Sequence, residues 1–259
     1  MTRSLLWAAA ATGFTFLMTT LGASLVFLFR KKVSGTMQRI FLGFAAGVMI
    51  AASVFSLLLP AMEEAEEMGI PGWIPSAGGF TLGIGFMLLL DVLMPHLHLG
   101  AKQPEGLHSS LRRTTLLVSA VTLHNIPEGM AVGAAYAGCV AAGAAAPAAA
   151  FTLALAIAIQ NVPEGAIVAL PLRTAGAGKG RAFLGGVLSG VVEPLAAGVT
   201  VLAAALIVPA LPWLLGFAAG AMLYVVAAEL LPTRGDSGPG ALAFAAGFTV
   251  MMILDVALG

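Results

Sequence analysis

Long apolar runs, separated by short polar links, constrain this chain more than any other feature. Each run is close to the roughly 20 mostly apolar residues that a membrane-spanning helix needs. We place eight runs at residues 5–29, 37–59, 74–94, 114–137, 150–170, 182–207, 212–231 and 241–258. The sequence therefore predicts an all-α polytopic membrane protein with one transmembrane domain over residues 1–259.

The composition excludes several other classes of protein. Hydrophobic residues make up 59% of the chain and charged residues only 9%, against about 25% charged in an ordinary soluble domain. A disordered chain needs the opposite balance, and a disulfide scaffold needs more than the single cysteine, Cys139. A nucleic-acid partner is not expected, because 12 basic residues balance 12 acidic ones without a dominant basic patch.

The first run is too long for a cleaved signal peptide. It extends from Leu5 to Phe29, whereas the apolar core of a signal peptide has about 7–15 residues. The basic stop that follows, at residues 30–32, has no convincing cleavage site before it. We therefore expect this run to be a retained span.

The basic residues predict the orientation of the chain. Ten of the 12 Lys and Arg residues fall in the links after the first, third, fifth and seventh runs, and Arg39 lies in the first turn beyond the first of these links. Only Arg3 lies on the other side. Cytoplasmic links carry the excess of basic residues. We therefore expect these links in the cytoplasm and both termini outside.

Two parts of the chain repeat each other. The second and seventh runs share Leu-Gly-Phe-Ala-Ala-Gly, at 42–47 and 215–220, and the runs that follow them share an Asp-Val pair, at Asp91 and Asp255. Spans one to three therefore match spans six to eight, in a 3+2+3 arrangement. Because three is odd, the copies have opposite orientations, as in many transporters. The alternative is a small-residue motif used only for helix packing.

The two middle spans carry a duplicated polar motif, HNIPEG at 124–129 and QNVPEG at 160–165. Residues three and four apart share one face of a helix, so each glutamate lies beside the polar groups that begin its motif. Each proline removes a backbone hydrogen bond, kinks the helix and frees a carbonyl oxygen. Two such helices would gather imidazole, amide and carboxylate groups, although packing kinks and neutral structural acids are the alternative.

Half of the acidic residues fall inside predicted spans, where no Lys or Arg accompanies them. An unpaired carboxylate in the membrane must be protonated or find a cation. One imidazole with carboxylate and amide oxygens suits Zn²⁺, Fe²⁺ or Mn²⁺ better than Na⁺ or K⁺. For the two aspartates, a role in helix packing is an equal alternative. The six acids are Asp91, Glu128, Glu164, Glu193, Glu229 and Asp255.

At these residues the sequence resembles the ZIP (Zrt/Irt-like) family of divalent metal transporters, in its bacterial GufA-like branch. The resemblance covers nearly the whole chain and rests on the two Pro-Glu-Gly motifs and the eight spans. It implies transport of Zn²⁺, with Cd²⁺, Fe²⁺ or Mn²⁺ as further substrates, across the bacterial inner membrane into the cytoplasm. It also implies a homodimer and an elevator-like alternating access, in which spans one, four, five and six move against the other four.

The resemblance further implies a binuclear metal site in which Glu128 and Glu164 bridge two ions. Gln160 departs from the family pattern, because many relatives have histidine there, and this weakens the first position for zinc. The first position would use His124, Glu128, Gln160 and Glu164, and the second Asn125, Glu128, Asn161, Glu164 and Glu193.

Other residues match positions along the family's transport path. Met49 and Ser56 would line it, Glu63 would lie at the outer entrance, and Glu229 would lie near the cytoplasmic exit. Ala228 stands where some relatives have a histidine, which puts the exit relay in doubt.

The link between the third and fourth spans contains three of the four histidines. They are His96, His98 and His108. A low-affinity landing site for released metal and an ordinary solvated loop are equal alternatives for this segment.

Three rival functions belong to other classes. A selective divalent-cation channel would use the two motif glutamates as a passive filter, and a metal-regulated receptor would not transport at all. An intramembrane metalloenzyme is disfavoured, because the chain has no His-Glu-x-x-His motif and the implied ligand sphere leaves no open position for water. We therefore predict a transporter and not an enzyme, with divalent metal ions and the lipid bilayer as its partners.

Overall fold

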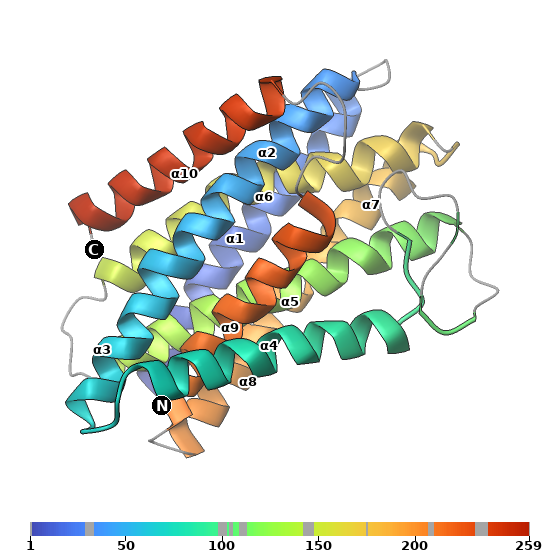
Figure 1. Ribbon diagram of the computed structural model, residues 1–259. Coiled ribbons are helices and arrows are strands. Elements are labelled where there is room, and N and C mark those ends of the chain that lie inside the picture. Colours follow the sequence, from blue (N-terminus) through green and yellow to red (C-terminus); the bar gives the residue numbers. More distant parts are fainter. Residues whose placement is uncertain are drawn as a thin grey trace.

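The computed structural model describes residues 2–28, 34–97, 103, 106–108, 113–141, 148–174, 176–206, 210–230 and 238–258. Within these ranges every regular element is a helix and none is a β-strand, so the all-α prediction is confirmed for them (Figure 1). The helices are α1 (Thr2–Leu28), α2 (Gly35–Ala52), α3 (Leu59–Glu67), α4 (Trp73–Leu93), α5 (Arg113–Ala141), α6 (Ala148–Thr174), α7 (Lys179–Gly190), α8 (Val192–Leu206), α9 (Leu211–Val225) and α10 (Gly238–Leu258), with π-helical segments η1 (Ser53–Leu58) and η3 (Val226–Leu230).

Seven helical stretches among the described residues are long and apolar enough to cross a membrane. They correspond to α1, the continuous α2–η1–α3, α4, α6, α7 with α8, α9, and α10. The remaining predicted span is α5, whose 29 residues exceed the required length but include the polar HNIPEG motif. The polytopic membrane architecture therefore follows from the helices themselves.

Two predicted spans differ from the helices that form. The second does not end before Pro60, because the π-helical segment η1 joins α2 to α3 and Pro60 stands at the first positions of α3. In η1 the Leu59 N–H bonds to the carbonyl oxygen of Val54, five residues earlier, and the helix continues to Glu67. The sixth span is divided at Val191, between α7 and α8. This break places Glu193 in the first turn of α8.

The helices form two groups. In one, α1 packs along α6, α5 packs along α8, and α7 contacts α1, α5 and α6. In the other, α2 packs along α10 and α4 along α9, and α3 contacts α9. Contacts of α5 with α9 and of α2 with α6 join the groups. Figure 1 shows α10 and α4 at opposite edges of the bundle.

The repeated sequence motifs occupy matching places in the second group. A Cβ atom added to Gly47 of α2 would lie 2.1 Å from the carbonyl oxygen of Phe244 in α10. A Cβ atom added to Gly220 of α9 would lie 2.1 Å from that of Phe80 in α4. Each Gly-Phe-Ala-Ala-Gly copy thus packs closely against the Asp-Val helix of the other copy, and each is followed by a π-helical segment. The inverted repeat itself stays a prediction.

The glycine that ends each Pro-Glu-Gly motif marks a close helix contact. A Cβ atom added to Gly129 would lie 2.2 Å from the carbonyl oxygen of Glu193. A Cβ atom added to Gly165 would lie 2.0 Å from the carbonyl oxygen of Thr19. The absence of a side chain lets α8 approach α5 and lets α1 approach α6. These approaches bring Glu193 and the middle of α1 to the polar motifs.

We expect Gly165→Ala to lower the free energy of unfolding by about 1–3 kcal/mol, the range found for overpacked interiors. The reason is the backbone of Thr19, which cannot move without separating α1 from α6. Gly13→Ala is the matched control, because nothing lies within 4 Å of its added Cβ, and alanine favours a helix over glycine by about 1 kcal/mol. The melting temperature in detergent checks this, and equal values for both variants would contradict the close approach.

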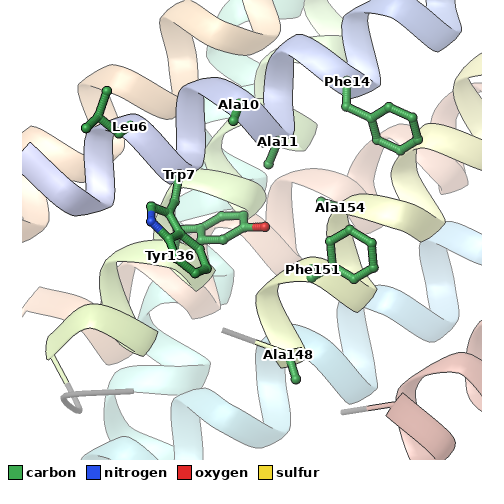
Figure 2. A pocket seen from close by; sticks show the side chains of 9 residues that line it. All are labelled: Leu6, Trp7, Ala10, Ala11, Phe14, Tyr136, Ala148, Phe151 and Ala154. Carbon is green, nitrogen blue, oxygen red and sulfur yellow. The ribbon is translucent and has the colours of Figure 1, made fainter. Parts of the chain in front are cut away.

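Figure 1 shows both termini at the end of the bundle where α3 lies. Two cavities open at this end. One, of about 440 Å³, lies among η1, α3, α5, α6, α9 and α10. The other, of about 560 Å³, lies among α1, α5 and α6 (Figure 2). An even number of crossings agrees with two termini at one end, and which side of the membrane they face stays a prediction.

Candidate metal site

Seven polar side chains from three helices gather in the interior of the bundle. None of them is more than 8% exposed. They are the residues that the sequence proposes as metal ligands, and they come from α5 (His124, Asn125 and Glu128), α6 (Gln160, Asn161 and Glu164) and α8 (Glu193).

The two Pro-Glu-Gly motifs face each other across α5 and α6. The Gln160 amide donates a 2.8 Å hydrogen bond from Nε2 to Oε1 of Glu128. Glu164 interacts with both Glu128 and His124. The carboxylates of the two motifs and the single imidazole therefore lie in one cluster, although α5 and α6 both continue as helices through their prolines.

Glu193 is held from two sides. The Asn161 amide donates from Nδ2 to both carboxylate oxygens, at 3.1 Å each. From α1, the Thr19 hydroxyl donates to Oε1 at 3.2 Å, and the Thr15 hydroxyl donates to Oε2. Its place in the first turn of α8 adds the favourable end of the helix dipole. All of these groups stabilise a charged carboxylate at a fixed position.

Sequence reasoning missed Thr15 and Thr19. A signal was present, because Thr12, Thr15 and Thr19 follow the three- and four-residue spacing of one helix face within an apolar span. All three are buried. A buried hydroxyl stripe in a membrane helix indicates polar partners on a neighbouring helix, which here include Glu193.

Five buried oxygens of the cluster have no hydrogen-bond partner within the described part of the chain. Buried polar atoms nearly always have partners. A cation would satisfy all five oxygens, and a proton would satisfy only those of the two glutamates. The arrangement therefore presents a patch of lone pairs suited to a positive ion. The oxygens are Oδ1 of Asn125, Oε2 of Glu128, Oε1 of Gln160, Oδ1 of Asn161 and Oε2 of Glu164.

No group of three or more His, Cys, Asp or Glu side chains forms a ready metal-binding cage among the described residues. The cluster instead mixes carboxylates with amide groups. Hard oxygen donors of this kind and one imidazole suit exchangeable divalent ions better than a tight structural metal.

Four acidic or hydroxyl residues line the cavity of about 440 Å³: Ser56, Glu63, Glu64 and Asp255. Ser56 donates a 2.5 Å hydrogen bond to Oδ1 of Asp255, and both residues line the cavity together with Glu63. From the sequence, Ser56 is proposed to line the path and Glu63 to lie at its outer entrance. Their role in a path stays a prediction, and the pairing with Asp255 was not foreseen.

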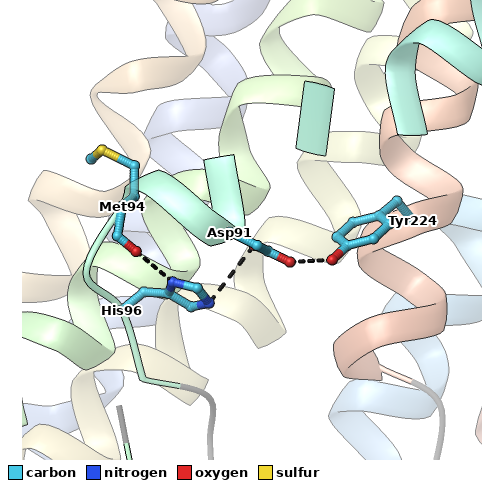
Figure 3. Close-up of polar contacts among 4 residues, drawn as sticks. All are labelled: Asp91, Met94, His96 and Tyr224. Carbon is cyan, nitrogen blue, oxygen red and sulfur yellow. Dashed lines mark hydrogen bonds and ion pairs between the residues drawn. The ribbon is translucent and has the colours of Figure 1, made fainter. Parts of the chain in front are cut away.

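Asp91 and His96 form a separate polar cluster (Figure 3). The Tyr224 hydroxyl of α9 donates to Oδ2 of Asp91, and His96 lies with Nε2 3.7 Å from Oδ1 of the same carboxylate. Nδ1 of His96 is 2.8 Å from the carbonyl oxygen of Met94. His96 is fully buried, so at this residue the segment is not a solvated loop. A landing site for released metal stays a prediction.

The remaining sequence-proposed residues lie apart from the cluster or outside the described residues. Met49 is fully buried in α2, within the main hydrophobic core. Glu229 lies in η3, and its side chain falls outside the described part of the structure. His98 also lies outside the described residues, and His108 is exposed.

Comparison with known proteins places the chain in a family. The family described as ZIP Zinc transporter matches residues 98–255. The chain is 39% identical to human zinc transporter ZIP11, over 99% of this chain and 98% of that protein. It is 43% identical to zinc transporter ZIPB of Bordetella bronchiseptica, over 94% of this chain and 79% of that protein, and 39% identical to zinc transporter GufA of Myxococcus xanthus, over 93% and 94%. The resemblance inferred from the two motifs is therefore confirmed, and the chain belongs to the ZIP family of zinc transporters.

Proposed function

We propose that this protein transports divalent metal ions, chiefly Zn²⁺, across the bacterial inner membrane into the cytoplasm. The relatives named as zinc transporters support zinc as the substrate. Cd²⁺, Fe²⁺ and Mn²⁺ are further substrates on this proposal, because their preferences for oxygen and imidazole ligands overlap with those of zinc.

The observation that carries the proposal is the buried cluster of unpartnered oxygens on α5 and α6. A cation that enters the cluster would supply the partners that these oxygens lack. We propose two adjacent ion positions, bridged by Glu128 and Glu164. His124 and Gln160 complete the first position, and Asn125, Asn161 and Glu193 complete the second.

The division into two helix groups supports alternating access. The cluster lies entirely in the group of α1, α5, α6, α7 and α8, which pack mainly on one another. We propose that this group moves as a unit against α2, α3, α4, α9 and α10, which form the scaffold. The reciprocal packing of the two repeated motifs supports a scaffold built from matching halves of an inverted 3+2+3 repeat.

Direction and assembly complete the proposal. The cavity with Ser56, Glu63 and Asp255 opens at the end of the bundle that also holds the termini. On the charge asymmetry of the links this end faces outward, so the cavity collects ions from outside. We also propose a homodimer, on the basis of the family resemblance.

The test is metal uptake into proteoliposomes loaded with a fluorescent zinc chelator. We expect uptake that saturates with external Zn²⁺, because each cycle carries a fixed number of bound ions. Protein-free vesicles are the control. Uptake that stays linear in concentration, together with unitary currents in a planar bilayer, would identify a channel and contradict alternating access.

A further inference from the structure

The cavity among α1, α5 and α6 is a groove in the membrane-facing surface. Its volume is about 560 Å³, within the range of about 300–1,000 Å³ that is usual for ligand pockets. Leu6 is 66% exposed and Phe151 54% exposed at its rim. Figure 2 shows that the rings of Phe14 and Phe151 lie at one end and the ring of Trp7 at the other.

The lining of the groove is almost wholly apolar. The buried Ala11 and Ala154 form its floor and the exposed Ala10 lies at its side, and these small residues leave room that larger side chains would fill. The hydroxyl of Tyr136 is the one side-chain oxygen among the lining residues that Figure 2 draws. From Trp7 to Phe14 the groove follows α1 for about 10 Å, at roughly 1.5 Å per residue. Such a shape suits a hydrocarbon chain.

Polar and aromatic groups mark one end of the groove as the membrane interface. Trp7 packs against Tyr136 with ring centroids 6.2 Å apart, and these two residue types concentrate at the level of lipid headgroups. The Arg3 guanidinium lies over the Trp7 ring, 5.5 Å from its centroid, one helical turn closer to the terminus. A positive charge therefore stands beyond the mouth of an apolar groove.

We propose that this groove binds an acyl chain of an anionic phospholipid, with the lipid phosphate facing Arg3. The apolar lining selects the chain, and the guanidinium complements the charge of the headgroup. The exposed rim opens to the bilayer, so the ligand can enter sideways from the membrane without crossing water.

The bound acyl chain would contact α1, whose Thr15 and Thr19 hydroxyls donate to Glu193. Phe14 lines the groove, and the next residue, Thr15, donates to the Glu193 carboxylate. α1 thus lies between the lipid and the metal cluster. The lipid proposal does not depend on transport, because its test measures lipid binding alone.

The experiment measures binding of phosphatidylglycerol and phosphatidylcholine with matched acyl chains to the detergent-solubilised protein by native mass spectrometry. We expect the first phosphatidylglycerol to bind about fivefold more tightly than phosphatidylcholine, the preference expected from one basic side chain at a membrane surface. Arg3→Gln should remove this preference and leave chain binding in place.

Ala10→Phe fills the groove from its exposed side and tests the chain pocket. We expect phosphatidylglycerol affinity to fall about tenfold, the loss expected when the groove no longer covers about two methylene groups. Ala9→Phe is the matched control, since Ala9 is exposed on the same helix and does not line the groove. Equal affinities for the two lipids, or equal effects of the two phenylalanine substitutions, would overturn the proposal. Dimers that contact each other through Leu6 and carry no lipid would also overturn it, because a second copy of the chain would then cover the groove.

Discussion

Glu164→Gln is expected to abolish metal uptake into proteoliposomes, a loss of roughly 100-fold or more. Replacing even an outer partner of a metal ligand costs about 10–100-fold, and Glu164 stands at the centre of the proposed site. Its Oε2 is buried without a partner, and it interacts with both Glu128 and His124. Glutamine keeps the shape of the side chain and one acceptor oxygen, so the variant isolates the charge. Uptake is measured with the zinc chelator inside the vesicles.

Glu67→Gln is the matched control for this prediction. It removes one carboxylate from the exposed end of α3, far along the chain from the cluster. We expect its uptake to equal that of the wild-type protein. Unchanged uptake by Glu164→Gln would exclude the cluster as the transport site, provided that the melting temperature shows that the variant is folded.

Much of the fold could be predicted from the sequence because a membrane imposes one dominant rule. A spanning helix satisfies its own backbone hydrogen bonds and must be long and apolar, so the spans are visible as runs of residues. The meeting of HNIPEG and QNVPEG was predictable for a related reason. They lie on neighbouring spans, and the hydrogen bond between Gln160 and Glu128 joins these two helices.

Other features could not be predicted because they depend on helices that are distant in the sequence. Thr15 and Glu193 are separated by 178 residues, and nothing in either local pattern pairs α1 with α8. The polar cluster around His96 depends in the same way on α9, because Asp91, which lies beside His96, accepts from Tyr224, 133 residues further along the chain. The division of the sixth span at Val191 directly follows Gly190, which packs closely against α1, where an added Cβ would lie 3.1 Å from the Phe16 side chain.

The second large effect is expected from the hydroxyls of α1. Removing both with Thr15→Val and Thr19→Val should raise the zinc concentration for half-maximal uptake by about 10–100-fold, as for other outer partners of metal ligands. Valine keeps the shape of threonine but cannot donate, so Glu193 would retain only the Asn161 amide among these side-chain donors. The carboxylate would then be less well fixed and its charge less well stabilised, because hydrogen bonds to a charged group contribute about 1.5–3 kcal/mol.

Thr12→Val and a serine rescue separate this positioning role from a general packing effect. Thr12 is buried on the same face of α1, but within the described part of the chain its hydroxyl bonds only to the Ala8 carbonyl oxygen of its own helix, at 2.7 Å. We therefore expect Thr12→Val to leave the half-maximal concentration unchanged. Thr15→Ser with Thr19→Ser should restore near-normal uptake, because serine keeps the donor and loses only a methyl group. If the serine pair is as impaired as the valine pair, the methyl contacts of α1 and not its hydrogen bonds to Glu193 determine zinc affinity.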